Sequence, residues 1–404
     1  MTAPVTIHYK EVKTAIKKEK FASPFTLGKY AIAPYMACEH GCLYCDGRAE
    51  KYYVQGDFSK DIVVRKNLIP RLETEITKLR EKGIISIGSG ITDPYQPIEE
   101  KERLVRKLGR ILEKNAFPAT LLTKSSLILR DLDIWKKVNE NAGFILFISL
   151  TFSDDRLRRI FEPRADSVES RLRVIREFKE NNIPVGVLAM PFLPFISDTR
   201  DAITTLYRRL SNMDVDFIIP GGLTLRPGRQ KDTFLKTIRQ KFPMHLGKIN
   251  RIYHENRSSG SSASFYQEDL SRRIRRVESG FTIPPVVPHR LYQWRLPKYD
   301  EVFVLLNHMK MLYQRRDVNV APLDRSIAGY LSWLNQEKTF YNRRRKIEDN
   351  YVDIKLEHQC RTGGLSKIIQ NEKLEDFLMD VILNRNVFDP LALRLEKGDA
   401  IITA

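Results

Sequence analysis

Three of the four cysteines of this chain, Cys38, Cys42 and Cys45, lie within eight positions of one another, in the segment ACEHGCLYCD. Three thiolates this close together can face one centre, and soft sulfur ligands suit an iron–sulfur cluster or a zinc ion. A four-iron cluster held by three cysteines keeps one iron open to a non-protein ligand. A structural zinc ion needs a fourth protein ligand, for which His40 and His358 are the candidates. The spacing favours the cluster over zinc, and three unrelated structural cysteines are the remaining interpretation.

The elements that would position this segment begin at Tyr30, where short apolar runs start to alternate with amphipathic stretches of helical length. The apolar runs predict strands over residues 30–36, 84–87, 119–122, 144–150, 185–190 and 217–219. The stretches between them predict helices over residues 65–81, 99–115, 131–139, 168–180, 198–210 and 230–240, with Ser167 and Ser197 as N-caps of two of them. Six strand-then-helix units predict an α/β fold with a parallel sheet, either an open doubly wound sheet or a partial (β/α) barrel. In both folds the chemistry lies at the carboxyl ends of the strands, and the cysteine segment follows the first strand.

The chain divides by composition into three parts. Residues 1–22 are lysine-rich with little apolar periodicity and predict an N-terminal arm or a short capping element. Residues 23–245 hold the strand–helix alternation and predict the core domain. Residues 246–404 predict an α-rich, basic C-terminal region that opens with a serine-rich turn stretch.

Positive charge is the strongest compositional signal. Over the whole chain, 68 Lys and Arg against 50 Asp and Glu give a formal net charge of +18, which favours a polyanionic partner. The C-terminal region carries two basic runs, residues 272–276 and 343–346, with aromatic residues nearby. Cations neutralise phosphates and aromatic faces stack on bases, so this composition suits nucleic acid. Solvated helices with ordinary core aromatics are the alternative.

Composition also excludes several classes of protein. Hydrophobic residues make up 42% of the chain, which is enough for a folded core and argues against wholesale disorder. Four cysteines in 404 residues do not form a secreted disulfide scaffold. The N-terminus has no secretory signal, and no apolar run is long enough to span a membrane. We therefore expect a cytoplasmic protein.

The cysteine motif, with Tyr44 before its last cysteine and a strand before its first, resembles that of the radical S-adenosylmethionine (SAM) superfamily. The resemblance implies a partial (β/α)6 barrel of the TIM type and a [4Fe–4S] cluster whose open iron binds SAM. It further implies that an electron from the cluster cleaves SAM to methionine and a 5′-deoxyadenosyl radical, which abstracts a hydrogen atom from the substrate. An electron donor of the flavodoxin or ferredoxin type is then the implied protein partner.

Motifs at later strand ends resemble the spore photoproduct lyase-related branch of this superfamily, often labelled DNA repair photolyase-like. In chain order they are GITDPYQPIE, TKS, ISL, FEP and MP. The resemblance implies that Thr92, Lys124 and Ser149 contact SAM, since a lysine and two hydroxyls suit its carboxylate and ribose. Tyr44 would offer a main-chain contact to the adenine, and Asp93 either bonds a ribose hydroxyl or initiates a turn. The alternatives are a surface lysine for Lys124 and a buried, backbone-bonded hydroxyl for Ser149.

One position departs from the pattern of this branch. Spore photoproduct lyase carries a hydrogen-donating cysteine two residues before the position of Thr92, where this chain has Gly90. Cys360 would replace it only if the C-terminal region folds over the barrel mouth, and the other interpretation is a plain buried or surface cysteine. No catalytic residue is therefore assigned. Three tyrosines near the predicted mouth suit a radical relay, substrate contact or a structural role: Tyr52, Tyr53 and Tyr95.

Three functions follow from these observations. The first is a radical SAM enzyme, lyase-like, that acts on nucleic acid. The second is a radical SAM enzyme that acts on a small metabolite or peptide, with the positive charge incidental. The third is a non-catalytic, metal-containing protein that binds nucleic acid.

Overall fold

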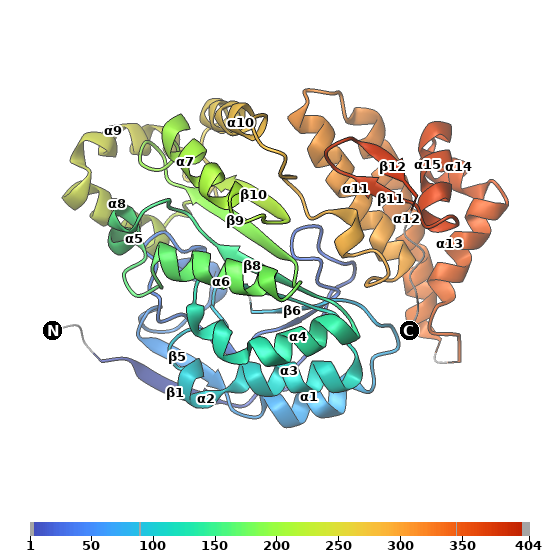
Figure 1. Cartoon of the computed structure of the whole chain (residues 1–404), viewed down its shortest axis with the longest axis horizontal. Helices are drawn as coiled ribbons and strands as arrows, with labels where there is room; N and C mark the ends of the chain where they lie inside the picture. The colour runs from blue at the N-terminus through green and yellow to red at the C-terminus, as the bar shows by residue number, and fades with distance from the viewer. Residues whose placement is uncertain (1–3, 89, 345, 398–404) are drawn as a thin grey trace. The chain divides into compact units, whose positions relative to one another are not determined.

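The computed structural model describes residues 4–88, 90–344 and 346–397 (Figure 1). Residue 345 of the second basic run and residues 1–3 of the expected arm lie outside this description. The chain forms two compact units. The first contains the chain up to Lys17, Ala31–Thr77 and Ser86–Pro285, and the second contains Lys18–Tyr30, Lys78–Ile85 and the chain from Val286.

A seven-stranded sheet has the strand order β10–β9–β8–β7–β6–β3–β2. Its strands are β2 (Lys17–Lys18), β3 (Tyr30–Ile32), β6 (Ile85–Ile87), β7 (Ala119–Thr123), β8 (Phe144–Ser149), β9 (Val185–Phe192) and β10 (Phe217–Gly222). β7, β8, β9 and β10 pair in parallel with their neighbours. The spatial order follows the chain order without the reversal that defines a doubly wound sheet. The expected α/β fold is confirmed, and the single winding direction is that of a partial (β/α) barrel.

Helices connect these strands as the apolar periodicity predicted (Figure 1). They are α1 (Leu68–Ile76), α2 (Glu99–Glu102), α3 (Leu104–Asn115), α4 (Leu132–Asn141), α5 (Asp155–Phe161), α6 (Val168–Glu180) and α7 (Arg200–Ser211). The helix expected over residues 99–115 is divided at Arg103, whose φ is +52°. Ser167 caps α6 as expected, with its hydroxyl accepting from Ser170 N. The prediction for Ser197 is wrong: Thr199 caps α7, and the Ser197 hydroxyl accepts from Leu193 N instead.

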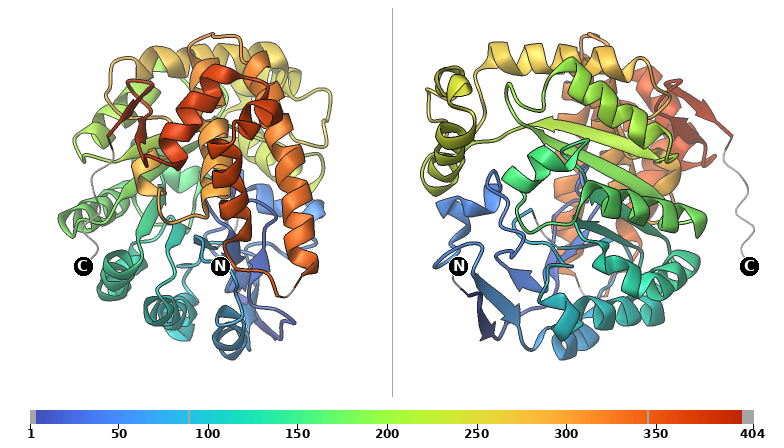
Figure 2. Two further views of the ribbon diagram at one scale, coloured as in Figure 1. Left: turned by 90° about the vertical axis from the view of Figure 1, so that its right-hand side faces the viewer. Right: turned by 60° about the vertical axis from the view of Figure 1, so that its left-hand side comes forward.

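The N-terminal segment is more ordered than an arm. β1 (Thr6–Lys10) pairs in parallel with β5 (Asp61–Arg65), and β4 (Tyr35–Met36) pairs with β5 in the antiparallel direction. Figure 2 shows these strands in dark blue near the N-terminus. The single strand expected over residues 30–36 is two strands, because Pro34 interrupts the run.

The boundary between the units differs from the expected one at residue 245. α8 (Arg229–Lys241), α9 (Pro243–Ile252) and α10 (Ser264–Glu278) belong to the first unit. α8 and α9 pack on each other, while α10 packs on α7 and β10. α8 was expected within the core domain, whereas α10 and most of α9 follow residue 245 and were assigned to the C-terminal region.

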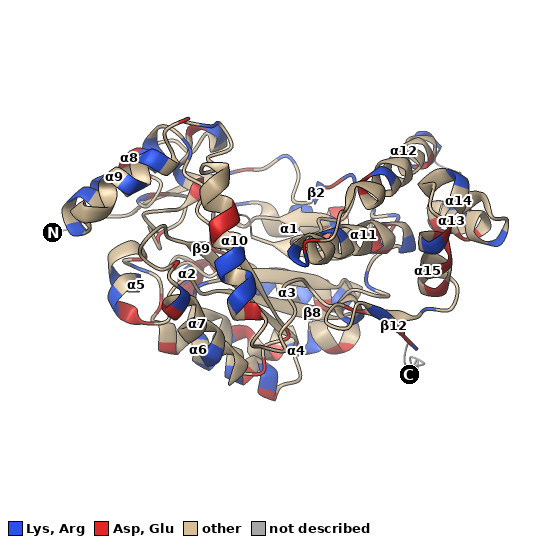
Figure 3. Cartoon of the chain, turned by 90° about the horizontal axis from the view of Figure 1, so that it is seen from above, with Lys and Arg blue, Asp and Glu red and all other residues tan. Residues whose placement is uncertain are grey.

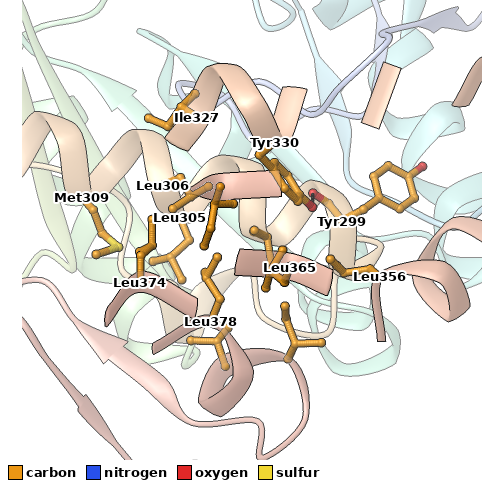
Figure 4. Close-up of a cluster of buried hydrophobic side chains, with 14 of the residues drawn as sticks. Tyr299, Leu305, Leu306, Met309, Ile327, Tyr330, Leu356, Leu365, Leu374 and Leu378 are labelled. Atoms are coloured by element: carbon orange, nitrogen blue, oxygen red, sulfur yellow. Dashed lines mark hydrogen bonds between the residues drawn. The ribbon is translucent and has the colours of Figure 1, made fainter. Parts of the chain in front are cut away.

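The second unit is largely helical, as expected. It contains α11 (Lys298–Arg315), α12 (Ala321–Arg343), α13 (Tyr351–Arg361), α14 (Gly364–Ile369), α15 (Glu372–Ile382) and the hairpin β11 (Val387–Asp389)–β12 (Arg394–Glu396). Its core is built from leucines of these helices, among them Leu306, Leu356 and Leu378 (Figure 4). Cys360 is buried in this core, where burial raises the pKa of its thiol to about 11. No helix in the described part of the chain is long and apolar enough to cross a membrane.

A buried polar network attaches the two short N-terminal segments to the second unit. The Tyr299 hydroxyl accepts from Lys29 Nζ at 2.9 Å and from Lys338 Nζ at 2.8 Å, and it donates to Glu81 at 2.8 Å. Lys29 also pairs with Asp300. Burial raises the pKa of Asp300, and Lys29 opposes that rise. Each of these buried charges therefore has a charged or hydrogen-bonding partner, as burial requires.

Close packing between β9 and β10 gives a stability prediction. Gly186 stands opposite Phe217, and a Cβ added to Gly186 would lie 1.9 Å from the phenyl ring. We expect Gly186→Ala to lower the free energy of unfolding by about 2–3 kcal/mol, because overpacked cores move side chains off their rotamers. Denaturant unfolding measures this loss, and adding Phe217→Leu should recover part of it. Gly247→Ala is the control: Gly247 has open space around its Cα, so a loss of similar size there would contradict the packing argument.

Candidate active site

The cysteine segment forms two successive turns after β4. Gly41 N donates to Cys38 O at 3.2 Å, and Cys45 N donates to Cys42 O at 3.3 Å. Gly41 has a φ of +64°, which glycine adopts without strain. Cys38 and Cys42 are buried, and Cys45 is half-buried. The turns therefore gather the three predicted ligands into one compact loop.

Arginine and backbone contacts hold this loop in place. Arg48 donates to Cys42 O at 2.9 Å and to Gly41 O at 2.8 Å. The guanidinium of Arg48 also lies 5.3 Å from the ring centroid of Phe58, whose carbonyl accepts from Cys38 N. Two carbonyls of the loop are thus bound by one cation.

The donor set has the chemistry of an iron–sulfur site. Burial raises the pKa of the Cys42 thiol, and the Glu162 carboxylate raises it further, while the Lys124 ammonium opposes both. Burial likewise raises the pKa of Cys45, to about 11. Iron displaces such protons, because thiolates are its ligands. Three soft donors beside a cation fit a [4Fe–4S] cluster. Each cysteine would bind a different iron of the cluster, which is a wider arrangement than the ligands of one metal ion; in the described ranges no three His, Cys, Asp or Glu side chains are spaced for a single ion.

A buried ion pair connects the loop to α6. The Tyr44 hydroxyl donates to the Glu162 carboxylate, which also pairs with Arg171. Arg171 donates in turn to Ser149 O at 3.0 Å. Glu162 and Arg171 are at most 1% exposed. Although burial alone would raise it, the pKa of Glu162 is held below its usual value by the charges of Arg171 and Lys124.

Three of the predicted SAM-contacting residues meet beside this ion pair. Lys124 Nζ donates to Ser149 Oγ at 2.5 Å, and the same ammonium lies 6.0 Å from the Tyr44 ring centroid. Thr92 contacts the start of the cysteine loop instead, where its hydroxyl donates to Ala37 O at 2.7 Å. Thr92 and Ser149 are buried, and Lys124 is half-buried. A cation and two hydroxyls therefore flank the cysteine loop.

Asp93 is occupied by protein donors. Its carboxylate accepts from Tyr95 N at 2.9 Å, from the Thr123 hydroxyl at 2.7 Å and from Lys124 N at 2.7 Å. His40 Nδ1 lies 3.4 Å from the same carboxylate without an aligned hydrogen bond. The bond to Tyr95 N is that of a turn-initiating aspartate. Asp93 thereby fixes the backbone of Lys124.

Residues that the sequence analysis missed hold the far side of the loop. Gln230, at the start of α8 and fully buried, donates to Tyr44 O at 3.0 Å. Arg226 donates to Asp46 Oδ1 at 2.7 Å, and its backbone N–H donates to Gln230 Oε1. The sequence signal that could have found them is the segment RPGRQ, which forms the turn between the sixth predicted strand and its helix. Barrel enzymes position active-site groups in such turns.

The three tyrosines near the predicted mouth have different surroundings. Tyr95 is fully buried and bonded to Asp131 and to the Trp135 indole, which is a structural position. The Tyr52 hydroxyl donates to Asp46. Tyr53 is 85% exposed.

Comparisons with known proteins indicate the family of this chain. The family model for the radical SAM superfamily matches residues 32–206. An uncharacterized protein of Methanocaldococcus jannaschii is 32% identical over 188 residues, which cover 45% of this chain and 68% of that protein. An uncharacterized protein of Mycobacterium tuberculosis is 24% identical over 275 residues, covering 67% and 79%.

A solved structure shares the fold. Spore photoproduct lyase complexed with dinucleoside spore photoproduct superposes with a TM-score of 0.50 at 16% identity, covering 68% of this chain and 79% of the lyase. At this identity the likeness concerns the fold alone. Together, the family match, the archaeal relative and the cysteine motif show that the chain belongs to the radical SAM superfamily, whose cofactors are a [4Fe–4S] cluster and SAM.

Proposed function

We propose that this radical SAM enzyme holds its cluster through Cys38, Cys42 and Cys45 and acts on nucleic acid in a lyase-like reaction. The observation that carries the SAM chemistry is the Lys124–Ser149 pair beside the cysteine loop, because it combines a carboxylate-binding cation with a hydroxyl. The likeness to spore photoproduct lyase and the net charge of +18 support nucleic acid as the substrate. When bound, the cluster supplies the electron that cleaves SAM, and the resulting 5′-deoxyadenosyl radical takes a hydrogen atom from the substrate. The protein binds and orients the reactants and excludes water.

Each flanking residue has a proposed role. Lys124 binds the carboxylate of SAM. Ser149 and Thr92 form hydrogen bonds with its ribose hydroxyl groups. The main-chain carbonyl of Tyr44 accepts from the adenine. Gln230 uses one lone pair of that carbonyl, and a second lone pair is available. Asp93 positions Lys124 through its backbone.

The fate of the radical separates this chain from spore photoproduct lyase. Gly90 carries no thiol, and a Cβ at Gly90 would meet no atom within 4 Å. We therefore assign no hydrogen donor at that position. We also propose a flavodoxin- or ferredoxin-type electron donor. Because oxidants attack an open iron, we place the enzyme in the reducing cytoplasm.

The cluster assignment predicts the effect of removing one thiol. Cys42→Ala should abolish cluster assembly and the formation of 5′-deoxyadenosine after anaerobic reconstitution and reduction with SAM. Bound iron, visible absorbance and product are the measurements. Cys360→Ala is the matched control and should retain all three signals, because Cys360 lies in the core of the second unit. Circular dichroism checks that the variant is folded, because unfolding would also remove the cluster. Product formation by Cys42→Ala would refute the assignment.

The SAM-binding role of Lys124 gives a second prediction. A hydrogen bond to a charged group contributes about 1.5–3 kcal/mol, so Lys124→Ala should weaken SAM binding by about 10–100-fold. Cluster absorbance should remain, since Lys124 is not a ligand. Equilibrium dialysis of SAM against the reconstituted protein measures the affinity. Lys136→Ala, at an exposed position on α4, should bind SAM normally. Equal affinities for the two variants would remove Lys124 from the site.

A further inference from the structure

The positive charge of the chain is densest in one short region. Residues 226–257 contain nine Lys or Arg and two Asp or Glu. Residues 246–404, which were expected to be basic, contain 26 and 20. The densest charge surplus therefore lies in α8, α9 and their flanking turns, in the first unit. Figure 3 shows blue bands along both helices.

The cations of α8 and α9 face solvent. Five of them are exposed and form no ion pair with any described residue: Lys236, Arg239, Lys241, Lys248 and Arg251. Opposite charges at the surface are scarce here, since Asp232 and Glu255 are the two acidic residues of the region. We call the five cations, with the helices that carry them, the α8–α9 surface. Unpaired cations on a rigid helix pair create a positive potential that attracts polyanions.

The first turn of α8 connects this surface to the cysteine loop. Arg229 N donates to Glu50 Oε1 at 2.9 Å, and the Arg229 guanidinium donates to Val54 O at 3.3 Å. Tyr53, which is 85% exposed, lies between Glu50 and Val54 in the sequence. Gln230 binds the Tyr44 carbonyl from the same turn. The first turn of α8 therefore contacts both the cysteine loop and the segment that carries an exposed aromatic ring.

We propose that the α8–α9 surface binds the sugar–phosphate backbone of a single-stranded nucleic acid, with a base stacked on Tyr53. This inference rests on the proposed function and names the surface that would bring the substrate to the cysteine loop. Phosphate-neutralising cations beside a solvent-exposed aromatic ring are the combination that single strands require. An acidic polypeptide would use the cations but has no base to stack on Tyr53.

The test uses the full-length protein and a fluorescent single-stranded oligonucleotide of about 20 nucleotides, with binding followed by anisotropy at several salt concentrations. The variant K236Q/R239Q/K241Q/K248Q should weaken binding by about 100-fold or more at low salt. It should also make the negative slope of log K against log salt shallower by up to about 3, since each phosphate contact contributes about 0.7 to the size of that slope. Tyr53→Ala should weaken binding by about 5–100-fold without changing the slope.

The matched control removes four exposed cations of the second unit, R325Q/R361Q/K367Q/K373Q. It should bind within about threefold of the unchanged protein, because its substitutions leave all the cations of the α8–α9 surface in place. Equal losses for the two quadruple variants would overturn the proposal, and so would binding of polyglutamate as tight as that of the oligonucleotide. Formation of 5′-deoxyadenosine without substrate is measured in parallel. If it persists while the surface variant binds normally, the surface is refuted and the SAM chemistry stands. If it is absent from the unchanged protein, the proposed function itself fails.

Discussion

The buried Glu162–Arg171 ion pair is the contact on which the candidate site depends. The Glu162 carboxylate accepts a hydrogen bond from the Tyr44 hydroxyl of the cysteine loop. The Arg171 guanidinium donates one to the carbonyl of Ser149 at the end of β8. Two charges inside a protein are costly to desolvate, and removing one partner of such a pair costs about 3–5 kcal/mol. The ion pair therefore ties the loop to the end of β8, at the expense of keeping a carboxylate near the Cys42 thiol.

The central region was predictable from the sequence because its signals are local. The helix Val168–Glu180 was expected at the observed bounds, since its apolar spacing and its Ser167 cap lie within one segment. The cysteine motif, with the later strand ends, identified the superfamily for the same reason. Lys124 and Ser149 were brought to one place by the parallel sheet, which aligns the carboxyl ends of its strands.

The remaining features depend on contacts between distant parts of the chain. β1 is a strand because β5 lies beside it, about fifty residues later, and its own sequence reads as a charged arm. Gln230 contacts Tyr44 across 186 positions. The densest positive charge was not singled out because composition was averaged over residues 246–404, whereas nine cations against two acidic residues lie between residues 226 and 257.

The interleaved units have a consequence for synthesis on the ribosome. The segments 18–30 and 78–85 belong to the second unit, whose other residues follow Val286. Lys29 and Glu81 therefore leave the ribosome long before Tyr299 and Lys338, their partners in the buried network. At about 5–20 residues per second, the interval between residues 85 and 286 lasts roughly 10–40 s. During that time these two charged segments have no partner helices, so the second unit closes only late in synthesis or after it.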